Sequence, residues 1–211
     1  MISENKEPLK VMFGGLGRTG SHSIAAALNR LGFKACHGSD IVKYLMGSHH
    51  NLAKAMIRGN MQEIMDATSA LGYNATMEAH SVFWEDVFKN EENYKDTKFI
   101  FTKRDFDSWF DSFIAMRHAT RVMNRFPLRL IPFFKIQTQW SSALSARQFQ
   151  LDDSVDPVDF VYYPERDESK LFHKARHSQN QEASLRITEE TPDRALLFDV
   201  KTDGYGKLCN L

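Results

Sequence analysis

Apolar runs and amphipathic stretches alternate along the chain. Residues 9–13 form an apolar run that ends at a glycine pair, as is typical of a buried parallel strand. Residues 21–31 carry apolar side chains at helical spacing on one face and end at Gly32, a common helix stop. Further strands are predicted at 33–36, 74–77, 98–102 and 195–200, with helical stretches after each of the first three. This order predicts an α/β fold with a central parallel sheet that helices cover on both faces.

One domain is expected for the whole chain, residues 1–211, because a core of this size needs no disulfide or metal to be stable. An irregular insert is predicted at about 120–170. Within it, residues 126–134 are apolar but contain prolines, and we expect them to form a buried wall or lid. Acids and prolines from about 151 to 169 predict a long loop, before a polar helix that runs to about 188.

Charge and cysteine content exclude several classes of partner. Lys plus Arg and Asp plus Glu number 27 each, so no overall positive field attracts nucleic acid or an anionic membrane. The two cysteines are far apart and predict ordinary thiols in a reducing compartment. The first ten residues contain acids and lysines in place of an apolar signal core, and no apolar run is long enough to span a bilayer. We therefore expect a cytoplasmic protein without a membrane or nucleic-acid partner.

No metal site is predicted. His173 and His177 lie four residues apart, as two zinc ligands on a helix would, but the sequence offers no evident third ligand.

The most informative segment is a glycine-rich loop between the first strand and the first helix. It reads Gly14-Gly15-Leu16-Gly17-Arg18-Thr19-Gly20-Ser21-His22-Ser23. Such a loop turns backbone N–H groups toward one point at the positive end of a helix, which is a site for phosphate or sulfate. The alternative is a plain glycine turn that joins strand to helix without a ligand.

Two specific interpretations of this loop meet difficulties. The three glycines at 15, 17 and 20 fit the dinucleotide fingerprint G-x-G-x-x-G, but the nearest acid for a ribose is Asp40, four residues beyond the predicted second strand. The loop also resembles the arginine end of the cysteine-dependent tyrosine phosphatase signature. Those enzymes need a thiolate six residues before the arginine, and Met12 stands there.

A third interpretation is a modified P-loop. A nucleoside triphosphatase would have a lysine directly after Gly20, followed by the hydroxyl residue that holds magnesium. Here Ser21 and His22 follow Gly20, and the positive charge comes earlier, as Arg18.

A second anion-binding element is predicted around the strand at 98–102. Arg104 follows the carboxyl end of this strand, where nucleotides bind in parallel sheets, and Ser112 lies eight residues later on the next predicted helix. Two helical turns separate them, so both side chains can face one anion. The alternatives are a surface ion pair of Arg104 with Asp105 or Asp107 and a solvated Ser112.

Together these motifs resemble the sulfotransferases that use 3′-phosphoadenosine 5′-phosphosulfate (PAPS). The family's loop reads G-x-G-R-T-G-T-x-S, followed by a helix and L-G-F, and residues 15–23 and 31–33 correspond to it. Its R-D-x-x-x-W-x-x-S element is seen at 104–112, and its L-L-x-F-D-V-K-x-G element at 196–204 with one extra residue. The likeness spans about 10–211. Two positions depart from it: Ser23 replaces an aromatic residue of many cytosolic members, so adenine must stack elsewhere, and His22 replaces a commonly small residue.

The resemblance implies a three-layer P-loop-type fold and transfer of a sulfuryl group from PAPS to a hydroxyl or amine of a small-molecule acceptor. It implies no metal, because a sulfuryl group in transfer carries less negative charge than a phosphoryl group. We expect a monomer or homodimer. The alternatives are a nucleotide-binding protein without catalysis, a nucleotide kinase and an NAD-binding enzyme.

The resemblance also assigns residues to roles. Arg104 and Ser112 would hold the 3′-phosphate of PAPS, and Arg18 would stabilise the leaving oxygen. The end of the middle strand offers two candidates for the general base, Glu78 and His80. The expected cofactor-binding residues are Gly17, Arg18, Thr19, Gly20, Ser21, His22, Ser23, Arg104 and Ser112.

Overall fold

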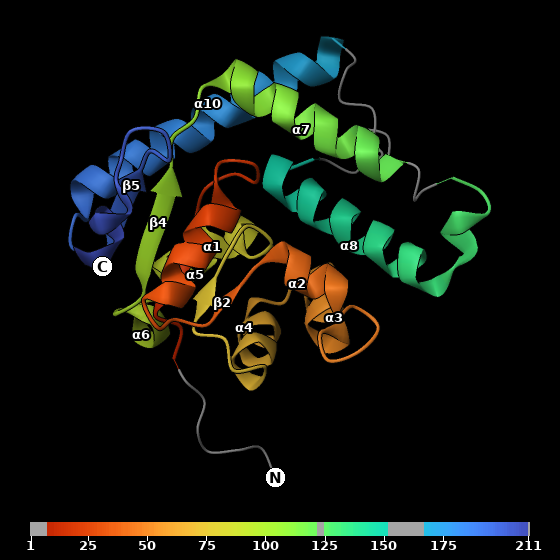
Figure 1. The fold of residues 1–211 in the computed structure, drawn as a ribbon, viewed down its shortest axis with the longest axis horizontal. Coiled ribbons are helices and arrows are strands. Elements are labelled where there is room, and N and C mark those ends of the chain that lie inside the picture. Colours follow the sequence, from red (N-terminus) through yellow and green to blue (C-terminus); the bar gives the residue numbers. More distant parts are fainter. Residues whose placement is uncertain (1–7, 122–124, 152–166, 211) are drawn as a thin grey trace.

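Five parallel strands form the centre of the computed structural model, in the order β2-β3-β1-β4-β5 (Figure 1). The structure describes residues 8–121, 125–151 and 167–210. The strands are β1 (Val11–Phe13), β2 (Ala35–Cys36), β3 (Ala75–Thr76), β4 (Lys98–Thr102) and β5 (Ala195–Phe198). The α-helices are α1 (Ser21–Arg30), α2 (Gly38–Lys43), α3 (His50–Arg58), α4 (Met61–Ala70), α5 (Trp84–Lys89), α6 (Glu91–Tyr94), α7 (Phe106–Arg121), α8 (Pro132–Phe149) and α10 (Asp167–Glu190). Short 3₁₀ helices are η1 (Ser81–Phe83), η3 (Leu128–Leu130) and η4 (Tyr205–Asn210).

The side chains of the strands alternate between two apolar layers, as the pleat of a strand requires. Met12 and Phe99 join a buried cluster with side chains of α3, α4 and α5. Val11 and Ile100 point to the other face and join a cluster with α1 and η4. Helices therefore cover both faces of the sheet, and the predicted three-layer α/β fold is confirmed.

The order of the strands brings three loops together. β1 lies between β3 and β4, with Met12 opposite Thr76 and Phe13 opposite Ile100. Because the strands are parallel, the segments that follow β1, β3 and β4 leave the sheet at the same edge. In open parallel sheets this is where ligands bind.

A group of helices lies beyond that edge. The arrow of β4 points toward α7 and α10, and α8 runs beside α7 (Figure 1). Leu16 of the glycine loop packs there against Trp109 and Phe113 of α7 and Phe149 of α8. The glycine loop is thus held between the sheet and these helices.

The prediction of an irregular insert at about 120–170 is wrong for much of that range. Residues 132–149 form the helix α8, and helix α10 already begins at Asp167. The rest of the predicted long loop, residues 152–166, lies outside the described residues. The expected burial of 126–134 is wrong for its first part, since Phe126 is 74% exposed and Leu130 66%, whereas Phe133 is partly buried and packs against the core. These residues turn the chain from α7 into α8 at the end of the pair that is far from the sheet (Figure 1).

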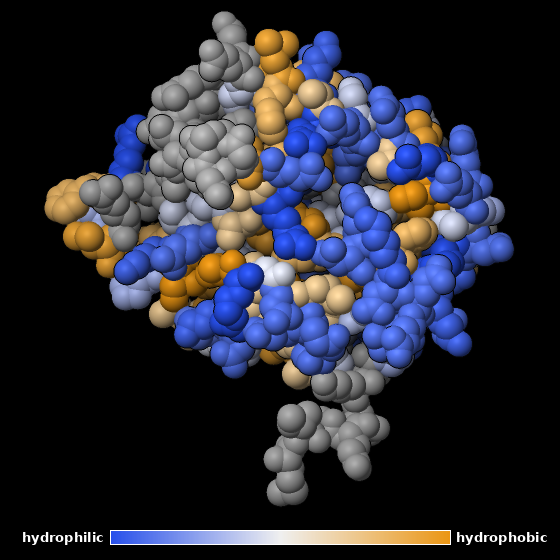
Figure 2. Space-filling model, turned by 180° about the vertical axis from the view of Figure 1, so that it is seen from behind, coloured by the Kyte–Doolittle hydropathy of each residue, from blue (hydrophilic) through white to orange (hydrophobic). Residues whose placement is uncertain are grey.

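Polar side chains cover most of the face seen in Figure 2, with apolar side chains in scattered patches. Among the residues that the structure describes, no helix is both long and apolar enough to cross a membrane.

Candidate functional site

The glycine loop enters the left-handed region of backbone conformation at one glycine and at one residue with a side chain, where this region is uncommon. Gly20, the N-cap of α1, has φ 98°, and Arg18 has φ 70°, so both lie in the left-handed region. A Cβ at position 20 would lie 2.4 Å from Cγ2 of Val200, so glycine is required for space as well as for φ. Thr19 is 3% exposed, and its hydroxyl donates to the carbonyl of Leu16 at 2.5 Å. The buried Thr19 side chain therefore stabilises the conformation of the loop.

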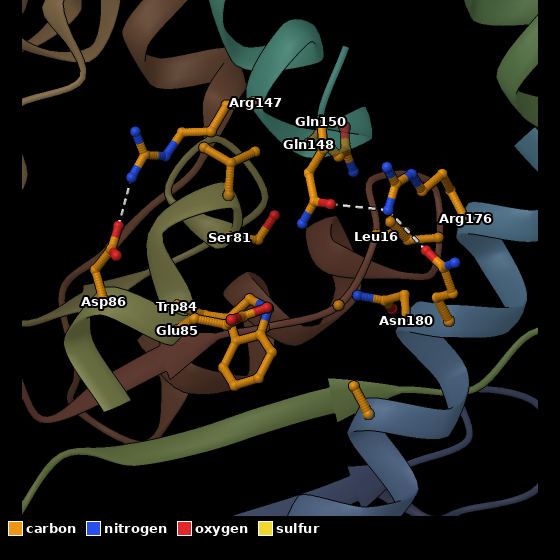
Figure 3. Close-up of a pocket in the computed structure, with 15 residues that line it drawn as sticks. Leu16, Ser81, Trp84, Glu85, Asp86, Arg147, Gln148, Gln150, Arg176 and Asn180 are labelled. Atoms are coloured by element: carbon orange, nitrogen blue, oxygen red, sulfur yellow. Dashed lines mark hydrogen bonds and ion pairs between the residues drawn. The ribbon is translucent and has the colours of Figure 1, made fainter. Parts of the chain in front are cut away.

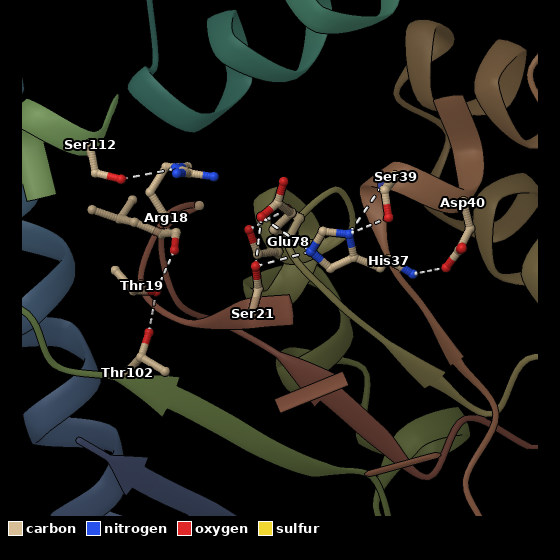
Figure 4. A network of polar contacts seen from close by, with 12 residues as sticks. Arg18, Thr19, Ser21, His37, Ser39, Asp40, Glu78, Thr102 and Ser112 are labelled. Atoms are coloured by element: carbon tan, nitrogen blue, oxygen red, sulfur yellow. Dashed lines mark hydrogen bonds and ion pairs between the residues drawn. The ribbon is translucent and has the colours of Figure 1, made fainter. Parts of the chain in front are cut away.

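The glycine loop and the start of α7 are joined by hydrogen bonds (Figure 4). The Arg18 Nε donates to Ser112 Oγ at 3.1 Å, and the Arg104 guanidinium donates to the carbonyl of Arg18. The hydroxyl of Thr102, the last residue of β4, donates to Thr19 Oγ1. Arg18, Arg104 and Ser112 line one cavity of about 440 Å³, which Gly20, Ser21 and His22 at the start of α1 also line. The structure thus brings together most of the residues that the sequence assigns to cofactor binding.

Glu78 lies across the same cavity, in a second polar group (Figure 4). The Ser21 hydroxyl donates to Glu78 Oε2 at 2.6 Å. His37 Nε2 lies 3.5 Å from the same carboxylate oxygen and 3.1 Å from Ser21 Oγ. Gly17 is close as well, since a Cβ there would lie 3.9 Å from Glu78 Oε2.

The tautomer of His37 follows from its contacts. The backbone N–H of Ser39 donates to His37 Nδ1 at 3.1 Å, and Asp40 Oδ2 accepts from the backbone N–H of His37, which closes a capping box on α2. Because Nδ1 accepts, the ring proton lies on Nε2, which faces Ser21 and Glu78. The rings of His37 and His22 are 3.8 Å apart.

The charge state of Glu78 reflects two opposing effects. Burial raises the pKa of Glu78, but the hydrogen bond from His37, the bond from Ser21 and the charge of Arg18 together bring that pKa below its ordinary value. Glu78 is therefore a carboxylate at neutral pH.

Two residues from the sequence-based set lie elsewhere. His80 is fully buried, its Nε2 lies 2.9 Å from Thr68 Oγ1, and burial lowers the pKa of His80 to about 3. Ser23 is exposed on another face of α1, where it lines a separate apolar groove with Leu31 and Tyr205. The structure does not bring either side chain to the cavity that holds Arg18 and Glu78.

The family model described as a sulfotransferase domain matches residues 10–211. The chain belongs to the sulfotransferase family. A search of curated proteins found no match. The family match favours the sulfotransferase interpretation of the glycine loop over the dinucleotide, phosphatase and triphosphatase interpretations.

Several residues near the loop of this sulfotransferase were not predicted from the sequence. His37 directly follows the end of β2, and Glu78 comes two residues after the end of β3. Because the carboxyl ends of parallel strands face the ligand crevice, the position of His37 in the sequence already indicates a place in the site. Arg117 and Trp140 also line the cavity. Trp140 could not be placed from the sequence because α8 was not predicted.

A second cavity of the sulfotransferase lies beside the same loop and holds none of the predicted site residues (Figure 3). Its volume is about 320 Å³, and residues 14–16 form part of its lining. Arg147 there pairs with Asp86 at 2.5 Å, and Arg176 donates to Gln150 and Gln179 at 2.8 and 2.7 Å. Both guanidinium groups are therefore engaged by the protein itself.

The histidine pair of α10 lies in an aromatic cluster. The ring of His173 is 4.6 Å from that of Phe149 and 4.9 Å from that of Phe113, and His177 lies 5.2 Å from Trp109. Burial lowers the pKa of His173 to about 3. Within the described ranges, no group of three or more His, Cys, Asp or Glu could hold a metal ion.

Proposed function

We propose that this sulfotransferase takes its sulfuryl group from PAPS and passes it to a hydroxyl or amine of a small acceptor. One observation carries the proposal. The guanidinium groups of Arg18 and Arg104 and the start of α1 line the same cavity as the carboxylate of Glu78. The positive groups suit a nucleotide with two anionic groups, and the carboxylate suits a hydroxyl that must lose its proton. In a sulfotransferase, the donor that fits such a cavity is a nucleotide with anionic groups at two positions.

The residues fit the two ends of that nucleotide. Arg104 lies two residues before α7 and Ser112 in its second turn, and both would hold the 3′-phosphate through charge-assisted hydrogen bonds. Arg18 and the backbone N–H groups at residues 17–21 would hold the phosphosulfate end at the positive end of α1. Ser112 already accepts a bond from Arg18, so the two anion sites are neighbours.

We assign the general base to Glu78. It lines the cavity as a carboxylate and is held by Ser21 and His37, whereas His80 is buried against Thr68 away from the cavity. In the transfer, Glu78 accepts the proton of the acceptor hydroxyl while the oxygen forms a bond to sulfur. The bond from sulfur to the 5′-phosphate oxygen breaks, and Arg18 stabilises the electron pair that leaves on that oxygen. The products are a sulfate ester and adenosine 3′,5′-bisphosphate.

We further propose a cytoplasmic protein that needs no metal and acts as a monomer or homodimer. Its cysteines, Cys36 and Cys209, are both free, as expected in a reducing compartment. Activity that survives a chelator would support the metal-free mechanism, and strict dependence on Mg²⁺ would contradict it.

The proposal is tested by melting curves with adenosine 3′,5′-bisphosphate, with 5′-AMP and NAD as controls. A ligand at one hundred times its dissociation constant adds about 2.7 kcal/mol, or roughly 5–10 °C for a chain of this size. We expect a shift with the 3′-phosphorylated compound alone, and expect Arg104→Ala to remove that preference. An equal shift with 5′-AMP or NAD would contradict the proposed donor. Transfer of ³⁵S-sulfate from PAPS to any acceptor then separates an enzyme from a protein that only binds.

A further inference from the structure

A smaller cavity lies between α7 and α8, next to the catalytic carboxylate. Its volume is about 130 Å³. Gly17, Arg18 and Glu78 line it, and both Arg18 and Glu78 also line the larger cavity. The two cavities therefore meet at the residues that we assign to the transfer. A molecule in the smaller cavity would lie beside Glu78.

Carbon surfaces form most of the walls of this small cavity. Trp109 and Phe113 come from α7, and Trp140 and Leu144 come from α8. Their exposed fractions are 1%, 4%, 8% and 9%, respectively. The rings of Trp109 and Phe113 are stacked, with centroids 5.2 Å apart and an interplanar angle of 18°. The walls are thus packed into the protein and already shaped.

The polar atoms of the two indoles are engaged by the protein. The N–H of Trp109 donates to the carbonyl of Gly17 at 2.8 Å, and the N–H of Trp140 donates to Met56 Sδ at 3.2 Å. The indoles therefore offer a ligand their aromatic carbon surfaces. A sugar would place hydroxyl groups against these carbons without partners, which is unfavourable. An aromatic ring would gain from stacking on them.

The volume matches a single ring. A cavity of about 150 Å³ lined by apolar side chains holds one benzene molecule. The present cavity has a similar volume of about 130 Å³, so one aromatic ring is the size that fills it. A polar edge is present as well, because the buried Arg117 lines the cavity and donates to Ser141 and Ser145 at 3.1 and 3.2 Å.

The base also suits an acidic hydroxyl. The contacts with His37 and Ser21 keep Glu78 a weak base, because its pKa is below the ordinary value. A phenolic hydroxyl such as that of tyrosine has a pKa near 10, whereas that of water is about 15.7, so a weak base removes a phenolic proton more readily.

We propose that the acceptor is a phenol with a single aromatic ring, which lies between α7 and α8 with its hydroxyl at Glu78. This inference rests on the proposed function. The phenolic O–H bond breaks and the proton passes to Glu78, while the oxygen forms the new bond to sulfur. The bond between sulfur and the 5′-phosphate oxygen of PAPS breaks at the same time, which gives an aryl sulfate and adenosine 3′,5′-bisphosphate.

The first test compares acceptors in the transfer of ³⁵S-sulfate from PAPS. The set is 4-methylphenol, 2-naphthol, benzyl alcohol and glucose. We expect kcat/KM to be at least tenfold higher for 4-methylphenol than for any of the other three. A preference for glucose or benzyl alcohol would overturn the phenol assignment, and a preference for 2-naphthol would overturn the one-ring limit.

The second test changes the cavity at Leu144, which lines it but does not line the nucleotide cavity. Leu144→Ala should raise the ratio of 2-naphthol to 4-methylphenol turnover at least tenfold. Leu144→Phe should lower 4-methylphenol turnover at least tenfold and keep the melting shift with adenosine 3′,5′-bisphosphate. Val82→Ala enlarges the same cavity and replaces Leu144→Ala if that variant does not fold. An acceptor ratio that changes in none of the folded variants would overturn the proposal.

Binding of 4-methylphenol separates this inference from the proposed function. It is measured by quenching of tryptophan fluorescence, since Trp109 and Trp140 both line the cavity. One outcome is that 4-methylphenol quenches the parent protein, that Leu144→Phe abolishes this quenching, and that the parent transfers sulfate to no acceptor. This outcome would support the ring-binding cavity and refute the sulfuryl transfer. Absence of quenching in the parent protein would overturn the ring-binding cavity, whatever the response to the nucleotide.

Discussion

Acid should destabilise this protein through a buried histidine, His80. Its side chain is 0% exposed, and burial lowers its pKa to about 3, whereas an unfolded histidine has a pKa of about 6.5. Between these two values the unfolded chain binds a proton that the native protein does not. The stability contributed by neutral His80 is therefore complete above pH 6.5 and decreases as the pH falls toward 3.

The size of this loss follows from the two pKa values. Integration from pH 7 to pH 5 gives about 2 kcal/mol for one such histidine. His173 has a similarly low pKa and should contribute about the same amount. Together they give about 4 kcal/mol, a large part of the 5–15 kcal/mol that stabilises a typical protein.

The assay is urea unfolding at pH 7, 6 and 5, with the parent protein and His80→Asn. The Thr68 hydroxyl donates to the carbonyl of Ile64, so in the contact with His80 the ring Nε2–H donates to Thr68 Oγ1. An asparagine amide can also donate a hydrogen bond but does not titrate, so the loss between pH 7 and 5 should shrink by about 2 kcal/mol. Thr68→Val is the matched control, because it removes the hydroxyl that contacts His80 and leaves the titrating ring in place. It should lower stability and keep the pH dependence of the parent. A pH dependence in His80→Asn equal to that of the parent would refute the reasoning.

Three further outcomes test the site. Glu78→Gln should lower kcat by about 10²–10⁴-fold and leave the melting shift with adenosine 3′,5′-bisphosphate unchanged; normal turnover would remove Glu78 from the mechanism. His37→Ala removes the hydrogen bond that lowers the pKa of Glu78, so that pKa should rise and the acidic limb of the kcat/KM profile should move to higher pH. An unmoved limb would show that His37 does not tune the base. Gly20→Ala should cost about 2 kcal/mol or more in urea unfolding, because of its φ of 98° and the contact with Val200. A variant as stable as the parent would contradict the loop geometry.

The sheet and the loop were predictable because strong local signals specify them. The strand predicted at 98–102 has the same bounds as β4, and the predicted start of the first helix is that of α1. Arg18, Arg104 and Ser112 line the same cavity because the segments that follow parallel strands lie at the same edge of the sheet.

Helix α8 was not predictable because its buried positions do not form one apolar stripe. Trp140 and Leu144 pack into the core, whereas Ser141 and Ser145 accept hydrogen bonds from Arg117 of α7. The polar residues therefore interrupt the pattern that would indicate a helix.

The choice between Glu78 and His80 also lay beyond the sequence. The chain turns sharply after β3, where the backbone N–H of His80 donates to the carbonyl of Met77 at 2.8 Å. This turn sends Glu78 to the cavity and His80 to the core beside Thr68. Two residues so close in the sequence give no signal of which one the turn exposes.

The contacts between the glycine loop and β4 have a consequence for selectivity among nucleotides. Thr102 donates a hydrogen bond to Thr19, and Arg104 donates one to the carbonyl of Arg18, so the two segments that we propose to bind anions are joined to each other. The separation of the two proposed sites is then a property of the folded sheet and exists before a ligand binds. A nucleotide whose phosphates match this separation binds without rearrangement of the protein, and shortening or lengthening the link between its phosphates should weaken binding even when its total charge is unchanged.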